Sequence, residues 1–265
     1  MSEPDLIDAL ARLRREAPLV HNITNQVVAN VTANALLAIG ASPAMVQAEQ
    51  EVADFAPRAA ALVVNIGTLT APQLAAMHLA AEAAASAGRP WILDPVAAGA
   101  TPYRLEAARG LLRRRPNVVR GNASEILALA GEAGSSKGVD SAHRSDAALQ
   151  AARQLARTHG ATVAVTGEVD YVTDGKDTLA IANGHPMLTR VTGMGCTATA
   201  LIGAFLGAGL HAMSAAVAGL AVLGVVGEQA AEHASAPGSF QIQVLDRLYL
   251  LDGETLARRA RISPA

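Results

Sequence analysis

Cysteine is almost absent from this 265-residue sequence, because Cys196 is the only one. A single cysteine cannot form an internal disulfide or a thiolate metal cluster, so we expect a reducing compartment, the cytoplasm. Aromatic residues make up only 3% of the chain, too few for the stacking platforms that bind single-stranded nucleic acids. A surplus of positive charge is also absent, since 21 basic residues stand against 23 acidic ones. This balance disfavours nucleic acids and anionic membranes as partners.

The first 18 residues mix acidic and basic side chains and contain no apolar run, so we predict no secretory signal. A later stretch, Val191–Gly227, has no Asp, Glu, Lys or Arg and is long enough to cross a bilayer. Much of it is Ala, Gly, Thr and Ser, and the segment Gly207–His211 divides it into two shorter pieces. We therefore expect buried core helices there and no membrane span.

Short apolar runs alternate with alanine-rich stretches of helical length through most of the chain. This alternation is typical of a parallel sheet with helices on both faces, so we predict one α/β domain over residues 1–265. The candidate strands are Leu19–Asn22, Ala44–Val46, Ala61–Ile66, Trp91–Asp94, Asn117–Arg120 and Thr162–Thr166. The candidate helices between them cover residues 25–39, 70–87, 102–114, 122–130 and 145–159.

The pattern changes after Thr166, where two short apolar runs at 171–173 and 178–182 flank the turn sequence DGKD. It predicts an antiparallel hairpin at one edge of an otherwise parallel sheet. From Gly195 onward we predict helices at 195–207, 212–234 and 239–251, a final charged segment, and no further strand. Residues 131–145 are rich in Gly and Ser, which is typical of a mobile surface loop.

Four candidate strands end in polar residues or glycine, among them Asn65, Asp94, Arg120 and Thr166. The carboxyl ends of parallel strands meet at one edge of a sheet, and ligands of open parallel sheets bind there. The sequence therefore predicts a functional edge built from these strand ends. Ordinary turn residues would give the same letters.

A glycine-rich segment, Arg190–Ala198, precedes a long apolar helix and contains Gly193 and Gly195. The free N–H groups and the positive end of such a helix form an anion site that suits phosphate. A helix entry that only allows close packing is the simpler alternative.

The same segment fits the GxGxxA dinucleotide fingerprint, but the next acidic residue after it is Glu228 and we predict no strand beyond it. A hydride-transfer function is therefore disfavoured. A Walker A loop is excluded too, because Asp177 follows Gly175-Lys176 and Asp170 stands where the loop needs its first glycine. An ATP-binding function would use another scaffold.

Four motifs occur in a fixed order over nearly the whole length: HNITN at 21–25, ILDPV at 92–96, RGNASE at 120–125 and TGMGC at 192–196. With these motifs the chain resembles the hydroxyethylthiazole kinases of the ribokinase-like superfamily. The resemblance implies a three-layer αβα sandwich, ATP and Mg²⁺, and phosphorylation of the hydroxyl of 4-methyl-5-(2-hydroxyethyl)thiazole in thiamine biosynthesis or salvage. It also implies a homotrimer with active sites at the subunit interfaces.

For the nucleotide, the resemblance implies four residues. Asp94 and Glu125 would hold Mg²⁺ directly or through water, which suits carboxylate oxygens. Arg120 would contact ATP phosphate through its forked guanidinium, and Thr166 would be a second nucleotide contact. Asp94 as a turn residue and Glu125 as an acid in the first turn of a helix are the structural alternatives.

For the thiazole, the resemblance points to Met45 and Gly193, with Asn25 and Gly67 as further lining residues. A methionine suits a flat, sulfur-containing ring because its side chain is polarizable and adaptable, although a buried methionine is more often core filler. The role of His21 stays undecided at this point, between a functional histidine and a hydrogen-bonded structural one.

Cys196, Gly193 and Gly195 are the candidate catalytic residues. Most ribokinase-like enzymes have an aspartate at the position of Cys196, whereas the family that this chain resembles has cysteine. A thiol at a helix N-terminus is acidified, so we expect an available thiolate. Because a metaphosphate-like transition state develops little charge on the attacking oxygen, Cys196 would mostly orient the hydroxyl.

Three alternatives remain at this point. The chain could be another ribokinase-like kinase, acting on hydroxymethylpyrimidine or pyridoxal. It could be a non-catalytic nucleotide sensor that keeps the fold, or, least favoured, an NAD oxidoreductase.

Overall fold

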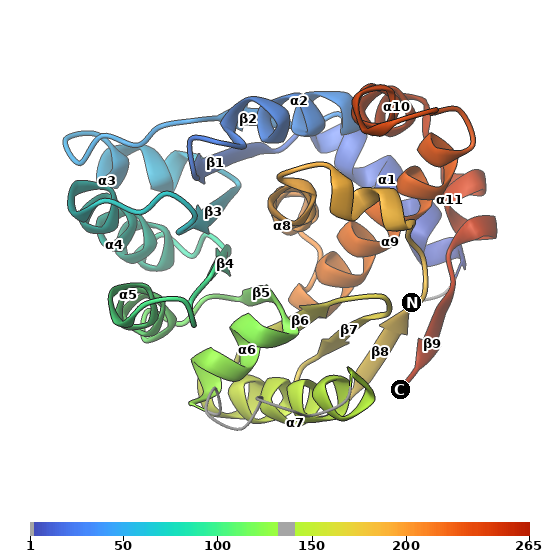
Figure 1. The fold of residues 1–265 in the computed structure, drawn as a ribbon. Coiled ribbons are helices and arrows are strands. Elements are labelled where there is room, and N and C mark those ends of the chain that lie inside the picture. The colour runs from blue at the N-terminus through green and yellow to red at the C-terminus, as the bar shows by residue number, and fades with distance from the viewer. Residues whose placement is uncertain (1–2, 132–140) are drawn as a thin grey trace.

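The computed structural model describes residues 3–131 and 141–265. Within these residues nine strands form one sheet in the order β2-β1-β3-β4-β5-β6-β7-β8-β9 (Figure 1). Pairing is parallel from β2 to β6 and antiparallel from β6 to β9. The strands are β1 (Leu19–Ile23), β2 (Ser42–Ala44), β3 (Ala61–Asn65), β4 (Trp91–Asp94), β5 (Val118–Asn122), β6 (Thr162–Thr166), β7 (Asp170–Thr173), β8 (Thr178–Ile181) and β9 (Ile262–Pro264). The predicted parallel sheet with an antiparallel edge is confirmed.

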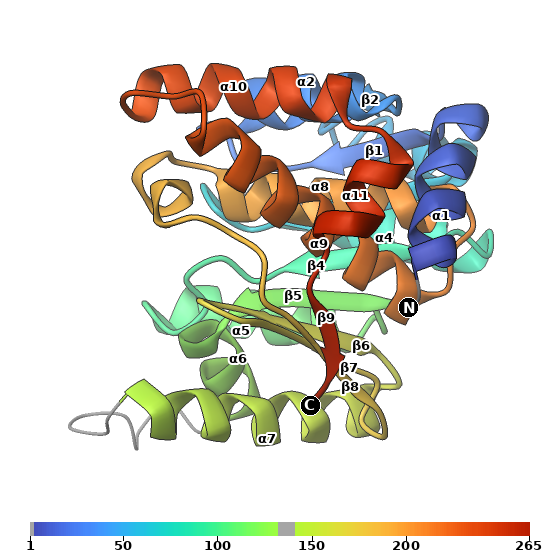
Figure 2. The same ribbon diagram turned by 90° about the vertical axis from the view of Figure 1, so that its right-hand side faces the viewer.

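Helices cover both faces of this sheet, as Figures 1 and 2 show. One face carries α1 (Glu3–Glu16), α2 (Ala29–Ile39), α8 (Met194–Gly207), α9 (Ala212–Ala231), α10 (Pro237–Leu250) and α11 (Gly253–Arg259). The other carries α3 (Val52–Phe55), the 3₁₀ turn η1 (Ala56–Arg58), α4 (Ala71–Ser86), α5 (Pro102–Leu112), α6 (Ala123–Ala130) and α7 (Ser141–His159). Neighbouring strand residues alternate between the two cores, with Val63 in the first and Leu62 and Val64 in the second. The three-layer αβα architecture is therefore as predicted.

The charge-free stretch forms α8 and α9, which pack against each other in the first core. Glycine makes this close contact possible, because a Cβ on Gly219 would lie 2.8 Å from the Ile202 backbone nitrogen. α9 is long and apolar enough to cross a membrane, but 72% of its most apolar window is buried inside the protein. It is a core helix, in agreement with the sequence interpretation.

Several elements differ from the sequence prediction. β9 contradicts the expectation of no strand after Gly195, since Ile262 pairs with Ile181 on the open edge of β8. Three residues are too few to show the alternating pattern of a strand in the sequence. This strand is recognised only from its pairing with the edge strand β8. β2 lies at Ser42–Ala44 and not at 44–46. α1 was not predicted, and α7 begins at Ser141 instead of 145.

The remaining part of the predicted surface loop, residues 132–140, lies outside the described residues. The segment before α8 includes a 3₁₀ turn, η2 (Pro186–Arg190), that the sequence did not predict. The hairpin of β7 and β8 is confirmed, with Val172 opposite Leu179.

Candidate active site

The strand ends expected to form one edge do lie together. Asn65 and Asp94 are register partners at the ends of β3 and β4, and Asn65 Nδ2 donates a hydrogen bond of 2.8 Å to Asp94 Oδ2. Thr166 ends β6 opposite Asn122, the last residue of β5. Arg120, in β5, connects the two pairs, because Nη2 donates to Thr166 Oγ1 at 2.5 Å and Nη1 lies 3.7 Å from Asp94 Oδ2.

Asp94 is completely buried at the centre of this edge. Its Oδ2 accepts hydrogen bonds from Asn65 and from Thr199 Oγ1 in α8, each 2.8 Å long. Burial raises the pKa of Asp94 to about 6, although the Arg120 guanidinium opposes that shift. Among the described residues, Asp94 Oδ1 has no hydrogen-bond partner, and it is buried. One carboxylate oxygen therefore remains available to a cation.

Glu125 uses both carboxylate oxygens on backbone groups. Oε2 accepts from Asn122 N at 2.8 Å, which completes a capping box at the start of α6. Oε1 accepts from Ala97 N, also at 2.8 Å, in the segment after β4. The structural alternative from the sequence is thus present, and Glu125 ties the β4 and β5 strand ends together.

The described residues contain no group of three or more His, Cys, Asp or Glu side chains that could enclose a metal ion. Mg²⁺ does not need such a group, because it usually keeps several waters and uses one or two carboxylates together with substrate phosphates. The free Oδ1 of Asp94 and the remaining lone pairs of Glu125 fit that mode of binding. The donor set is compatible with Mg²⁺ bound alongside a nucleotide.

The glycine-rich turn begins α8 at the same edge. Gly193 caps the helix with φ +84°, a left-handed conformation that glycine adopts without strain, and its carbonyl accepts from Thr197 N at 2.8 Å. The N–H groups of Met194, Gly195 and Cys196 have no acceptor within the helix. A Cβ on Gly195 would lie 2.6 Å from Arg120 Nη1, so the guanidinium packs directly on this turn. The turn combines free N–H groups with a cation, which makes an anion site.

Cys196 differs from the sequence expectation of an acidified thiol. Burial and the negative charge of Asp94 raise the pKa of the Cys196 thiol to about 11, more than Arg120 and the amides of Asn65 and Asn25 lower it. The helix N-terminus therefore does not decide the protonation of this group, and the expected thiolate is wrong. Cys196 is a neutral thiol near pH 7.

Asn25 lies beside Cys196, and Gly67 lies against Asn25. Asn25 Nδ2 donates to Asn65 Oδ1 at 2.8 Å and lies 3.6 Å from Cys196 Sγ. Gly67 N donates to the same Asn65 oxygen at 2.9 Å. A Cβ on Gly67 would lie 2.5 Å from Asn25 Nδ2, so this position must be glycine. The structure thus brings both residues into one polar cluster, which also contains Asn65, Asp94, Arg120 and Cys196.

Met45 and His21 lie on the β1–β2 side of the sheet, where His21 is the register partner of Ala44. Met45 directly follows β2 and is half-buried. His21 is fully buried, with Nε2 2.8 Å from Val46 O and its ring edge-on to Phe55 at 5.0 Å. Burial lowers the pKa of His21, so the ring is neutral. His21 supports the segment that carries Met45, which agrees with its structural interpretation.

A groove of about 310 Å³ is lined by residues that follow β1, β2 and β3 in the chain. Its lining includes Gln26, Gln47 and Thr70, which are near neighbours in sequence of Asn25, Met45 and Gly67. Gln73 crosses its base and donates to both Thr24 O and Gln47 Oε1.

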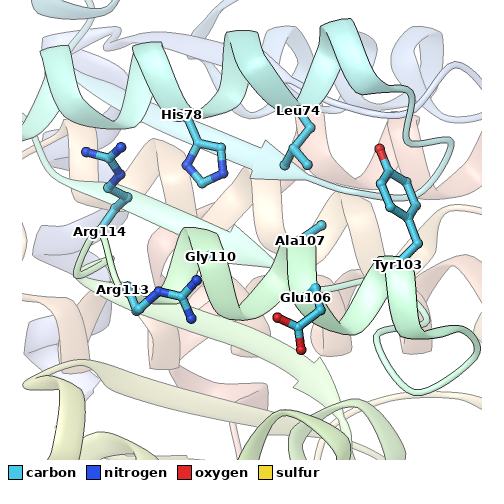
Figure 3. Close-up of a pocket in the computed structure, with 8 residues that line it drawn as sticks. All are labelled: Leu74, His78, Tyr103, Glu106, Ala107, Gly110, Arg113 and Arg114. Carbon is cyan, nitrogen blue, oxygen red and sulfur yellow. The ribbon is translucent and has the colours of Figure 1, made fainter.

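A larger groove of about 640 Å³ lies between α4 and α5, as Figure 3 shows. It is lined by Leu74, His78, Tyr103, Glu106, Ala107, Gly110, Arg113 and Arg114. None of these residues belongs to the polar cluster. Arg114 is exposed and pairs with Glu82 at 2.9 Å.

Three residues of the site were not assigned from the sequence. Asn65 stood among the polar strand ends, but nothing local distinguished it from a turn residue. Thr199 lies inside an apolar helix, one turn beyond Gly195, and only the fold brings its hydroxyl to Asp94. Asp170 begins β7 and accepts from Gly167 N at 2.9 Å, and burial raises the pKa of Asp170 to about 6. It fixes the turn that follows Thr166.

Comparison with known proteins decides the family. The sequence model of the hydroxyethylthiazole kinase family matches residues 10–254. The chain is 59% identical to a hydroxyethylthiazole kinase of Granulibacter bethesdensis over 252 residues, which are 95% of this chain and 92% of that protein. The chain belongs to the hydroxyethylthiazole kinase family. A hydroxyethylthiazole kinase of Tolumonas auensis is 52% identical over 94% of both chains.

Solved structures agree with this family assignment. A hydroxyethylthiazole kinase protein from Pyrococcus horikoshii OT3 superimposes with a TM-score of 0.91 at 43% identity, covering 98% of both chains. The pyridoxal kinase of Staphylococcus aureus in complex with ADP gives a TM-score of 0.65 at 14% identity over 93% of this chain and 98% of that one. This second likeness shows the ribokinase-like fold alone.

Proposed function

We propose that the chain transfers the γ-phosphoryl group of ATP to the hydroxyl of 4-methyl-5-(2-hydroxyethyl)thiazole, as the family name of its relatives indicates. The observation that carries the proposal is the packing of Arg120 on the glycine turn of α8, beside the buried Asp94. Phosphoryl transfer depends on positioning and charge neutralisation, and these groups supply both.

For the nucleotide, Arg120 and Thr166 bind the ATP phosphates at the sheet edge, which their mutual hydrogen bond supports. The N–H groups of Gly195 and Cys196 stabilise charge on the moving phosphoryl group, because they are fixed before the reaction begins. Asp94 and Glu125 would hold Mg²⁺, which neutralises charge on the phosphate oxygens when it is bound. Asp94 is mostly ionised at neutral pH because its pKa is about 6.

For the acceptor, Met45, Gly193, Asn25 and Gly67 form the thiazole end of the site. The Cys196 thiol is protonated near pH 7, so it contacts and orients the hydroxyl and does not remove its proton. A strong base is unnecessary, because the attacking oxygen gains little charge in a loose transition state.

We also propose that three copies assemble with active sites at their interfaces. In support, several large apolar side chains are exposed on α10 and on or just before α2, which pack side by side (Figure 2). They are Val27, Leu37, Ile242, Tyr249 and Leu250. Val27 is 63% exposed and only two residues from Asn25, so a neighbouring copy bound there would reach the thiazole end. Light scattering tests this assembly, and a monomer mass of 27.0 kDa would contradict it.

The single cysteine supports a cytoplasmic location, and the charge balance supports small molecules as the only substrates, without nucleic-acid or membrane partners.

A kinase assay with the thiazole alcohol, ATP and Mg²⁺ tests the proposed reaction. We expect formation of the phosphate ester, and slower reaction with pyridoxal and with hydroxymethylpyrimidine at equal concentrations. ATP should raise the melting temperature and NADH should not. Faster turnover of either alternative alcohol, or no ATP consumption with any alcohol, would contradict the proposal.

A further inference from the structure

Asn65 occupies the centre of the polar cluster, and none of the sequence motifs contains it. It is 1% exposed and all of its side-chain hydrogen bonds are short. Nδ2 donates to Asp94 Oδ2 at 2.8 Å, and Oδ1 accepts from both Asn25 Nδ2 and Gly67 N. One amide thus joins the buried carboxylate to the acceptor end of the site.

The direction of each hydrogen bond in this chain of contacts is determined. The Gly67 backbone N–H can only donate, so the Asn65 atom that it meets must be the oxygen. That oxygen requires a donor from Asn25, which must therefore present its nitrogen. The same nitrogen faces Cys196 Sγ at 3.6 Å. Within the described part of the chain both hydrogen bonds of the Asn25 side chain use Nδ2, and Oδ1 remains available as an acceptor.

Packing prevents the Asn25 amide from adopting another position. A Cβ on Gly67 would lie within 2.7 Å of Nδ2, Cβ and Cγ of Asn25, so the backbone at Gly67 is in close contact with the whole amide stem. Asn25 itself is 4% exposed. A flipped Asn25 amide would place its Oδ1 against Asn65 Oδ1. Asn65 cannot flip in response, because it would then lose the hydrogen bond from Gly67 N.

We propose that Asn65 is a positioning residue that holds the Asn25 amide with Oδ1 toward the thiazole alcohol. There Asn25 Oδ1 accepts the hydrogen bond of the substrate hydroxyl. Asn65 does not touch the substrate. The inference rests on the proposed kinase function and gives the hydroxyl a fixed oxygen acceptor. The neighbouring sulfur of Cys196 is only a weak acceptor.

A double-mutant cycle tests whether Asn65 acts through Asn25. Asn65→Leu keeps the number of side-chain heavy atoms and removes the hydrogen bonds to Asp94, Asn25 and Gly67, and Asn25→Ala removes the amide. We expect each single variant to lower kcat for the thiazole alcohol by about tenfold or more, with the KM for ATP changed less than about twofold. The double variant should be no slower than the slower single variant, because coupled residues are not additive. Losses that multiply would overturn the proposal.

Asn183→Leu is the matched control. Asn183 is also buried, donates to the Glu228 carboxylate at 3.1 Å and accepts from a backbone N–H, that of Arg261, at 2.6 Å. Both leucine variants should lower the melting temperature, but only Asn65→Leu should lower kcat. Equal melting losses with an unchanged kcat in Asn65→Leu would show that Asn65 is merely structural and would overturn the proposal.

Alkylation of Cys196 by iodoacetamide gives a readout without substrate, because the chain has no other cysteine. Asn65→Leu and Asn25→Ala should each shift the rate away from the wild-type value, and Asn183→Leu should leave it unchanged. If the wild-type protein transfers no phosphoryl group to the thiazole alcohol, the proposed function fails and these rates decide alone. A wild-type rate in Asn65→Leu would then overturn the coupling to Asn25.

Discussion

At the scale of single residues, burial decides the chemistry of the site more than residue type does. Asp94 and Cys196 are both acids whose pKa is raised, because the interior disfavours their charged forms. Arg120 keeps Asp94 ionisable near neutral pH, whereas the nearby Asp94 charge keeps Cys196 protonated. The same environment thus prepares a carboxylate for a cation and a neutral thiol for an alcohol.

Replacement of the thiol tests its role. If Cys196 only orients the hydroxyl, Cys196→Asp should retain kcat within about tenfold of wild type, since a general base contributes about 10²-fold or more. Steady-state kinetics with the thiazole alcohol measure this. Cys196→Ala is the companion variant, and a loss of about 10³-fold in it would show that the sulfur takes the proton.

The buried carboxylate also gives a pH dependence of stability. An unfolded aspartate loses its proton near pH 3.8 and folded Asp94 loses it near 6, so between these values the folded protein binds more protons. The free energy of unfolding should therefore fall as pH rises through this window, by about 3 kcal/mol at most from this group. Urea denaturation without divalent ions should show a smaller fall in Asp94→Asn. An identical pH dependence in both proteins would contradict the buried charge.

At the scale of elements, the start of α8 is the part of the fold that the site depends on most. Its first turn has free N–H groups, as every α-helix does. To bind an anion, this turn also needs the left-handed backbone of Gly193 and the absence of a side chain at Gly195, which lets Arg120 pack against it. Glu125 plays a comparable part in α6, where its capping box keeps two strand ends in place. Helix N-termini therefore build the nucleotide end together with the strand ends.

A side chain at Gly195 should remove activity. Its Cβ would lie 2.6 Å from Arg120 Nη1 and 2.8 Å from Nη2, so Gly195→Val displaces the guanidinium from the turn. We expect kcat/KM to fall by about 10³-fold, the size of a lost oxyanion donor or more. Gly238→Val is the matched control, because Gly238 is also the second residue of its helix and has open space around it. Normal turnover in Gly195→Val would remove the anion-site assignment.

At the scale of the whole molecule, the C-terminal strand β9 completes the sheet. β9 pairs with β8, and Arg261 ties it to α9 through Glu228 at 2.6 Å. Glu228 also accepts from Asn183 Nδ2 and Gly184 N, so the segment before α8 and the C-terminal strand share one anchor. This anchor lies outside the polar cluster and serves stability.

Loss of that anchor should be mild. Arg261 is about half exposed, so Arg261→Ala should lower the free energy of unfolding by about 1 kcal/mol, the range of an exposed ion pair with additional hydrogen bonds. The kcat for the thiazole alcohol should stay unchanged. Chemical denaturation and the kinase assay measure the two effects, and a large fall in kcat would show that this edge of the sheet takes part in the reaction.

The sequence by itself determined the fold class, most elements and the family, because these depend on local periodicity, glycine helix ends and motifs that are contiguous in the chain. HNITN, RGNASE and TGMGC identify the site's segments without any knowledge of contacts. β9 escaped prediction because its pairing partner, β8, is some 80 residues away in sequence.

Only the tertiary structure decided which groups meet and which of them carry charge. Asn65 and Thr199 reach Asp94 from a neighbouring strand and from a helix beyond residue 190, and neither shows a local signal. The protonation of Cys196 also depends on these distant neighbours, because desolvation and the Asp94 charge act through space and not along the chain. Sequence names the residue types at the site, whereas burial and proximity, which arise only on folding, set their chemistry.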